Sequence, residues 1–293
     1  MGIFPQLLAN GIAAGSTYAL IAIGFGLIYA TTRFFHFAHG AVYAAAAYAA
    51  YAGVSIFHLP LVPAMAVAVI FAACFGVLME IGVYRPLRQR GTGPASLLLA
   101  SLGLFIVFEN AISMFFGAET KVLYPISNFS FAVAGALITP IQIVTVATSV
   151  ATCLAVWAFL LFTSTGRATR AVADDAELCR IKGVHVERTI VITFALGSGL
   201  AGIGAILAAL DTDMRPTMGF DALLMGVVAA VVGGVGSIPG ALLGGLLLGL
   251  ALNLGVWKLS TGWQDAIAFC LLILFLVVKP QGFFGLPLRR TSV

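Results

Sequence analysis

Residues 7–30 read LLANGIAAGSTYALIAIGFGLIYA, and this apolar stretch decides the fold. At about 1.5 Å per residue, a helix of this length spans the roughly 30 Å hydrocarbon core of a bilayer. The first 32 residues contain no Lys or Arg, so the basic start that a secretory signal peptide needs is missing. We therefore expect a permanent membrane-spanning helix here and no cleavable signal peptide.

The composition of the whole chain has the same character. Of its 293 residues, 61% are hydrophobic and only 9% are charged, whereas a soluble domain has about a quarter charged residues. Lipid must therefore be the main solvent, and continuous apolar runs favour helices over the alternating strands of a membrane barrel. We predict an all-α membrane protein, a polytopic bundle of about eight or nine transmembrane helices that forms a single domain over residues 1–293.

Nine apolar segments are candidate spans. They cover residues 7–30, 40–57, 61–84, 95–117, 140–162, 189–210, 220–236, 238–257 and 263–279. The segments 220–236 and 263–279 are short, and either one fits a broken or re-entrant helix. If every segment crosses, twelve Lys and Arg residues fall on one side and three on the other. Basic residues collect on the cytoplasmic side, which predicts a periplasmic N-terminus and a cytoplasmic C-terminus.

A faint internal echo relates the two halves of the sequence. Residues 14–16 (AGS) and 196–198 (LGS) each precede an apolar run, and Gly15 and Gly197 lie 182 residues apart. Each run ends in a polar break, at 33–40 in the first half and at 211–219 in the second. The two runs cross in opposite directions in this topology. The echo predicts an inverted repeat of four helices plus four, joined by the span at 140–162, as transporters commonly have.

Glycine spacing in the last third of the chain indicates close helix packing. Gly236, Gly240 and Gly244 recur every fourth residue, and Gly245 and Gly249 continue the pattern on a neighbouring face. Small residues at this spacing let two helix backbones approach closely within lipid.

Several functional classes are not indicated by the residues. Four cysteines lie far apart, at Cys74, Cys153, Cys179 and Cys270, so neither a disulfide framework nor a metal site is expected. The histidines lack a partner carboxylate at usable spacing, which disfavours an intramembrane enzyme and any catalytic site. The net charge of +4 is small and scattered, so no nucleic-acid partner is expected. No G-x-x-x-x-G-K-[ST] motif occurs, so this chain needs another subunit to hydrolyse ATP.

Five residues near the breaks are candidates for a solute pathway. His36 and His39 lie in the first break, Tyr43 lies on the helix that follows, and Gly219 ends the second break. Glu109 lies within the span 95–117, where a carboxylate costs roughly 2.5–3.5 kcal/mol and should face the bundle or be neutral. Four of the five have a plainer interpretation. The histidines could be capping groups, Tyr43 could be aromatic packing, and Glu109 could snorkel to the outer interface.

The cytoplasmic loop 164–188 has the pattern of one short amphipathic helix at the membrane surface. Ala171, Leu178 and Ile181, with Val172 or Ala176 beside them, form a narrow apolar face, and charges cover the rest. A C-terminal cap is expected at Gly183. The helix is either a surface anchor or a coupling helix that docks on an ATPase. The docking interpretation involves Arg170, Asp174, Ala176, Glu177, Leu178, Ile181 and Gly183.

Seven stretches, spread in order along the chain, together resemble one known family. They are GSTYALIAIG (15–24), FAHG (37–40), YRPLR (84–88), GRATRA (166–171), IKGV (181–184), GGVGSIPGA (233–241) and KPQGFFG (279–285). These stretches are similar to the permease subunits of high-affinity branched-chain amino-acid ABC transporters, and they cover essentially the whole chain. The resemblance implies a bacterial inner-membrane protein with a coupling loop at 167–184.

The same resemblance implies partners. They are a second related permease, two cytoplasmic ATPases that carry the ATP and Mg²⁺, and a periplasmic solute-binding protein, besides the membrane lipid itself. No cofactor is implied for this chain.

Three residues depart from the family pattern and leave the solute open. His36 stands where the family usually has Asn, Met225 where many members have Lys, and Glu109 where an amide is common. Relatives carry urea, short amides or other amino acids, which remain alternatives to branched-chain amino acids. An ion-driven secondary transporter is the competing class. Such a transporter usually has several ionisable residues in mid-membrane, and here Glu109 alone is a fair candidate.

Overall fold

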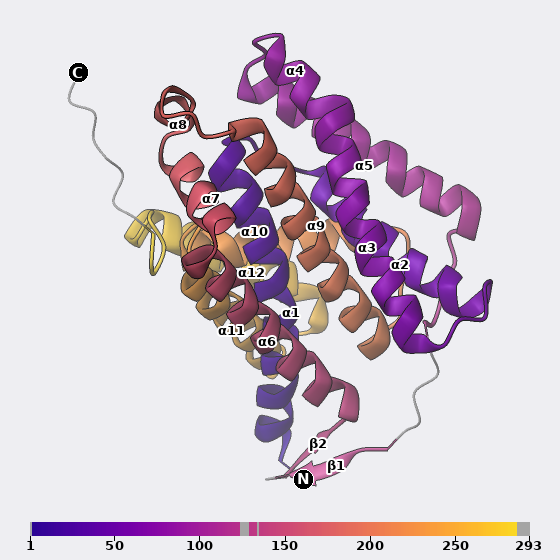
Figure 1. The fold of residues 1–293 in the computed structure, drawn as a ribbon. Coiled ribbons are helices and arrows are strands. Elements are labelled where there is room, and N and C mark those ends of the chain that lie inside the picture. The colour runs from indigo at the N-terminus through magenta and orange to yellow at the C-terminus, as the bar shows by residue number, and fades with distance from the viewer. Residues whose placement is uncertain (1, 124–128, 134, 286–293) are drawn as a thin grey trace.

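The computed structural model describes residues 2–123, 129–133 and 135–285. Nine long helices form a bundle in this part of the chain (Figure 1). They are α1 (Ile3–Thr32), α2 (Ala38–Ser55), α3 (Leu61–Met79), α5 (Pro94–Phe116), α6 (Pro140–Phe162), α9 (Val186–Asp211), α10 (Met218–Gly233), α11 (Ile238–Gly255) and α12 (Gln264–Val278). Each corresponds to one predicted span, with ends that differ by a few residues.

Length and composition make this a membrane protein. Within the described residues, seven helical segments are long and apolar enough to cross a bilayer. Two of these segments include elements that adjoin a long helix. In one, α3 continues through a π-helix (Glu80–Tyr84) into α4 (Arg85–Gln89). In the other, a 3₁₀ turn (Thr261–Trp263) precedes α12. The predicted short span 220–236 forms α10, an apolar helix of 16 residues. The prediction of a polytopic helical bundle is confirmed.

The helices pair as two equivalent halves. In the first half α2 packs against α3 and α5, and in the second half α10 packs against α11 and α12. Across the halves, α1 packs against α10 and α11, while α9 packs against α2 and α3. Figure 1 shows α1 and α9 running in opposite directions, with α6 between the halves in sequence. This exchange of partners is what an inverted repeat of four helices plus four produces, and α6 is the joining helix as predicted.

Glycines set the closest helix contacts. A methyl group added at Gly15 of α1 would lie 2.7 Å from the carbonyl oxygen of Gly245 on α11, closer than real side chains approach. One turn away, Gly11 meets Gly249, while Gly244 faces α10 at Ala229. The glycine pattern of α11 therefore packs against two helices, which confirms the prediction of close packing.

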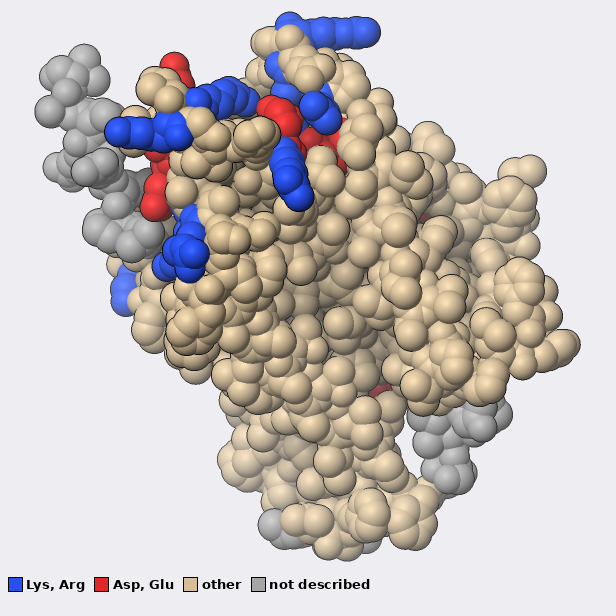
Figure 2. Space-filling view, in the orientation of Figure 1, with Lys and Arg blue, Asp and Glu red and all other residues tan. Residues whose placement is uncertain are grey.

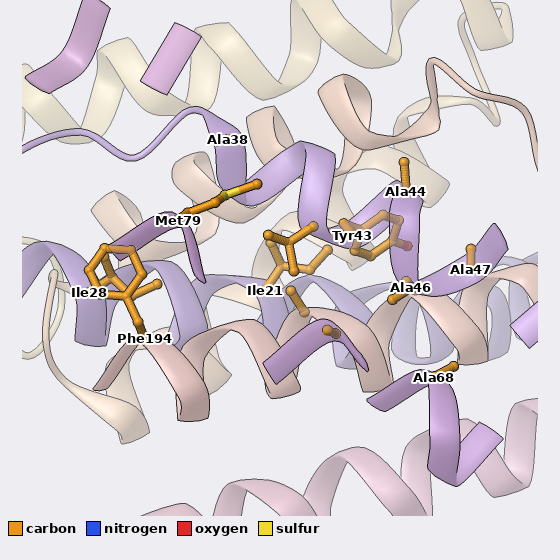
Figure 3. Packing of buried hydrophobic residues seen from close by; sticks show 14 of the residues in the cluster. Ile21, Ile28, Ala38, Tyr43, Ala44, Ala46, Ala47, Ala68, Met79 and Phe194 are labelled. Carbon is orange, nitrogen blue, oxygen red and sulfur yellow. The ribbon is translucent and has the colours of Figure 1, made fainter. Parts of the chain in front are cut away.

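The core joins residues from both halves. Ile21 and Ile28 of α1, Tyr43 of α2, Met79 of α3 and Phe194 of α9 belong to one buried cluster (Figure 3). Small alanines of α2 fill the space between them and let this helix lie deep in the bundle. α2 is thus held by protein on most sides, which suits a helix that follows a break.

Charge is concentrated at one end of the molecule. Figure 2 shows Lys and Arg over α4 and the two short helices α7 (Ser164–Asp174) and α8 (Ala176–Ile181), at the end opposite the N-terminus. This region is called the charged end below. The flank beneath it is apolar, and large side chains such as Val62, Ile70 and Met114 are exposed there. Such a surface is suited to lipid.

A small hairpin at the N-terminal end was not predicted. β1 (Phe131–Val133) pairs antiparallel with β2 (Ala136–Ile138) between α5 and α6. Gln6 of α1 holds it, donating to the carbonyl oxygen of Leu137 (3.0 Å) and accepting from its amide (2.8 Å).

Candidate functional site

The first break turns the chain back into the bundle. α1 ends at Thr32, and Arg33 adopts the left-handed conformation (φ 57°). The chain then re-enters as α2, whose first turn is closed by the His39 amide on the His36 carbonyl oxygen (3.2 Å) and the Gly40 amide on the Phe37 carbonyl oxygen (3.1 Å). The break is therefore an ordered turn.

Ser101 of α5 completes the break. Its hydroxyl accepts a hydrogen bond from the Phe37 amide (3.1 Å), and its one proton can go to the carbonyl oxygen of Phe35 (3.2 Å) or to that of Leu98 on its own helix (2.9 Å). Irregular backbone within a membrane protein needs such partners because lipid offers none. Sequence reasoning missed Ser101. Ser101 is one of three serines in the apolar stretch 95–117, with Ser96 and Ser113, so no local signal singled it out.

The two breaks meet where α2 crosses α10. A methyl group added at Gly40 would lie 2.5 Å from the carbonyl oxygen of Gly219, and one added at Gly219 would run into the carbonyl oxygen of Gly40. The contact joins the first turns of α2 and α10, the helices that follow the two breaks. In an inverted repeat the axis that relates the halves lies in the membrane plane, so equivalent helices that meet in this way are expected to cross near mid-depth.

His36 and His39 are both fully buried, with ring centroids 5.8 Å apart. His36 Nδ1 lies 3.1 Å from the hydroxyl of Tyr84, while its Nε2 has no hydrogen-bond partner among the described residues. Neither ring nitrogen of His39 has a hydrogen-bond partner among the described residues. Neither side chain caps α2, so the capping interpretation is not supported. Buried polar groups without partners are rare and usually have a functional reason.

The other predicted pathway residues lie around the same crossing. Tyr43 is buried one turn after His39. On α5, Phe105 lies against Gly40 and against Phe220 of α10 (ring centroids 6.0 Å). Glu109 is half-buried one turn beyond Phe105, on the same face of α5. The structure thus sets Gly219 against Gly40, next to His39 in sequence, with Tyr43 one turn along α2 and Glu109 one turn beyond Phe105 on α5.

A small cavity lies between α1, α10 and α11. Its volume is about 10 Å³, which is room for about one water molecule. It is lined by residues such as Ala22, Gly26 and Ala230, and none of the five predicted pathway residues borders it. This cavity is too small for an amino acid.

The loop 164–188 forms two helices, so the prediction of one amphipathic helix is wrong. α7 and α8 meet at Asp175, whose extended backbone (φ −152°, ψ 100°) breaks the helix. The Asp175 carboxylate accepts a hydrogen bond from the Leu178 amide (2.9 Å) and so starts α8 as its N-cap. The break reorients α8, so the apolar face predicted across both helices does not form. Val172 and Cys179 point inward, and Leu178 and Ile181 point outward.

The end of α8 is capped as predicted. Gly183 has φ +81° and donates to the Arg180 carbonyl oxygen (3.1 Å), and the Val184 amide donates to that of Cys179 (2.9 Å). This pair of bonds is the Schellman motif, which favours glycine at the left-handed position.

The side chains predicted to dock on an ATPase lie on the outer face of this segment. Leu178 is 51% exposed and Ile181 77% exposed. The exposed set also includes Arg170, Asp174, Glu177 and Gly183, while Ala176 is half-buried. Beneath them, α7 packs on the end of α6, since a methyl group at Gly166 would collide with the backbone at Phe159. α7 and α8 thus form a platform, packed on the end of α6, that presents apolar and charged groups outward.

Comparison with known proteins is consistent with these features. Residues 7–276 match the family described as branched-chain amino acid transport system, permease component. The high-affinity branched-chain amino acid transport system permease protein LivH of Escherichia coli (strain K12) is 35% identical over 298 residues, covering 97% of this chain and 96% of LivH. BraD of Pseudomonas aeruginosa, with the same description, is 34% identical over 301 residues, covering 97% of this chain and 96% of BraD.

One solved structure shares the fold. PsaBC from Streptococcus pneumoniae, in complex with Fab, aligns over 96% of this chain and 93% of its own, with a TM-score of 0.55 and 11% identity. At this identity the likeness concerns the fold alone. The family match and the identity with LivH and BraD extend over nearly the full sequence, and the chain therefore belongs to the branched-chain amino-acid transport permease family.

Proposed function

We propose that this chain is the membrane-spanning permease subunit of an ATP-driven importer for branched-chain or related amino acids. The observation that carries the proposal is the 35% identity with LivH over 97% of the chain. The exposed α7–α8 platform supports it, because a permease without an ATP-binding motif needs a surface on which a motor subunit can act.

The proposal includes the partners and the membrane. Two cytoplasmic ATPases bind ATP and Mg²⁺, a second related permease completes the membrane part, and a periplasmic binding protein delivers the solute. The complex lies in the bacterial inner membrane. The charged end faces the cytoplasm because basic residues collect there (Figure 2). A reporter active only in the cytoplasm should work when fused after Arg90 or Lys182 and be silent after Glu119; activity at Glu119 would overturn this orientation.

The ATPases dock on α7 and α8 in this proposal. The outward side chains of Leu178 and Ile181 enter an apolar groove of the motor, a common mode of helix recognition. Arg170, Asp174, Ala176 and Glu177 surround them as a mostly polar rim, and Gly183 ends the helix. The alternative role for this segment is a surface anchor, which would need no partner.

The solute passes beside the Gly40–Gly219 crossing in this proposal. Transporters with inverted repeats place their sites near mid-membrane at interrupted helices, and the close approach of α2 and α10 at Gly40 and Gly219 supports a site there. His36, His39, Tyr43, Glu109 and Gly219 are the proposed pathway residues. The buried histidine nitrogens without partners support a polar role at this point.

Uptake measurements test the function. The assembled complex, with its cognate binding protein, should accumulate radiolabelled leucine in competition with unlabelled valine or isoleucine. Accumulation of urea or short amides in place of leucine would support the proposed pump and replace the proposed solute. Accumulation of none of these, with ATPases bound, would contradict the proposed solute class.

A further inference from the structure

A chain of ion pairs crosses the charged end. Arg88 of α4 forms a two-pronged pair with Glu80, in which Nη1 donates to Oε2 (3.0 Å) and Nη2 contacts Oε1. The same Nη2 lies 3.0 Å from Oε2 of Glu187, in the first turn of α9. The other carboxylate oxygen of Glu187, Oε1, accepts a hydrogen bond from Arg180 of α8 (3.2 Å). Four alternating charges thus link the docking segment to the π-helix that continues α3.

Burial increases along this chain. The Arg180 side chain is 59% exposed, Glu187 28%, Arg88 16% and Glu80 0%. A carboxylate as buried as Glu80 is stable only with its partner in place, because an uncompensated buried charge is strongly unfavourable. Arg88 cannot leave Glu80 at low cost, and it must move with whatever moves Glu187. The chain is therefore anchored at its inner end and open to displacement at its outer end.

The inner end reaches the first break. Glu80 opens the π-helix, and Tyr84 closes it. The Tyr84 hydroxyl lies 3.1 Å from Nδ1 of the buried His36, and both rings contact Phe194 of α9. Pro86 follows two residues after Tyr84 and has no amide to donate, so helical hydrogen bonding changes register here. Single π-turns of this kind often occur at functional sites.

A second link runs beside the first. Arg33, the residue that ends α1, donates through Nη2 to the Ala173 carbonyl oxygen near the end of α7. The docking segment is thus attached to both sides of the break. Arg33 attaches α7 to the start of the break. The ion-pair chain attaches α8, through the π-helix, to His36.

We propose that Arg88, held between Glu80 and Glu187, is the positioning residue that transmits movement of α7–α8 to the break around His36. This inference rests on the proposed function, since it needs a motor on α7–α8. A displaced α8 pulls Arg180 and Glu187. Arg88 then follows, turning the π-helix and with it the Tyr84 contact to His36. Nothing in this step is covalent, and each link is a hydrogen bond or an ion pair already present.

The alternative is that the chain of ion pairs is only a structural clip, meaning that it holds α4, α8 and α9 together and transmits no movement. A clip would affect assembly and thermal stability and leave the stoichiometry of the surviving complexes unchanged. A transmitting element would alter the solute transported per ATP hydrolysed in complexes that still assemble. That ratio is therefore the readout that separates the two roles.

The test uses the assembled complex in proteoliposomes. Glu187→Gln removes one charge at the middle of the chain and leaves the buried Glu80–Arg88 pair intact, so the fold should survive. We expect the transport-to-hydrolysis ratio to fall about tenfold, within the range of measured coupling effects, while the ATPases still co-purify. Glu187→Asp keeps the charge and should restore most of the ratio. Arg90→Gln, two residues past Arg88 and without an ion pair among the described residues, is the matched control.

Arg180→Gln is a second variant in case Glu187→Gln does not assemble, because Arg180 is exposed and its loss leaves the buried links in place. It should lower the ratio less than Glu187→Gln does. A normal ratio in whichever of the two variants assembles would overturn the inference and leave the chain as a clip. If the unmodified permease bound no ATPases, that result would contradict the proposed function instead. Failure of the inference and failure of the proposed function are therefore distinguishable.

Discussion

Where α2 crosses α10 there is no room for one methyl group, whereas on α8 the whole side chains of Leu178 and Ile181 project outward. The Gly40–Gly219 crossing is complete within this chain, because backbone packs directly on backbone. The α7–α8 platform is incomplete, since none of the described residues covers its outer apolar groups. The contrast separates what the chain does alone, which is to hold the helices after the two breaks against each other, from what we propose that it does with partners. Substitutions in the two regions should therefore fail in different ways.

The largest effect is expected at the crossing. Gly219→Ala places a methyl group on the backbone of Gly40, which no rotamer change can relieve. We expect a loss of about 3 kcal/mol, at the upper end of overpacking costs, seen as a lower melting temperature of the purified permease. Gly199→Ala is the matched control, because its methyl group would meet only Ala73 at 3.9 Å. Equal melting temperatures for the two variants would contradict the close crossing.

The next effect is expected on the platform, where the fold should be unaffected. Leu178→Glu puts a charge into the proposed motor groove and should weaken docking by at least ~2 kcal/mol, the scale of a central contact. Pull-down of the ATPases and solute uptake should both fall, while the melting temperature of the permease stays constant. Leu59→Glu, in the loop after α2, is the control for ATPase binding. Normal pull-down and uptake by Leu178→Glu would make α7–α8 a surface anchor.

A smaller loss is expected where the first break is tied to α5. Ser101→Ala leaves the Phe37 amide and the Phe35 carbonyl without their side-chain partner. The cost should be about 1–2 kcal/mol, as for a buried group left unsatisfied, measured by thermal unfolding in detergent. Ser96→Ala, on the exposed side of the same helix, should leave the melting temperature unchanged. If both variants melt alike, the break does not depend on Ser101.

The smallest effect is expected at the edge of the proposed pathway. Glu109→Gln keeps the shape of the side chain and removes its charge. If Glu109 contacts solute or a gate, the apparent KM for uptake should change measurably, with assembly intact. The change should stay below about tenfold, which corresponds to roughly 1.4 kcal/mol of binding free energy. Unchanged uptake kinetics would return Glu109 to the snorkelling interpretation.

Much of the fold could be predicted because it depends on local patterns. Apolar runs predicted all nine long helices, and the inverted order of the halves followed from two breaks and a basic-residue count. Gly183 could be assigned because a left-handed helix end favours glycine. The break at Asp175 was missed, although an Asp that precedes a short helix is a common N-cap.

Contacts between distant segments could not be predicted from local pattern. Ser101 and the break it completes lie more than 60 residues apart, and Arg88 and Glu187 are separated by 99 residues. A lone Ser or Glu in a sequence does not name its partner. For the same reason, glycine spacing predicted that α11 packs closely but did not show that its partners are α1 and α10.

The central claim is that motor subunits on the charged end drive solute through breaks held at mid-membrane. Proteoliposomes containing the full complex test it most directly, with ATP supplied only to the face that carries α7–α8 and the loaded binding protein on the other. The account predicts accumulation of leucine that requires ATP on that face and is lost with Leu178→Glu. Accumulation driven by an ion gradient without ATP, or by ATP on the opposite face alone, would contradict it.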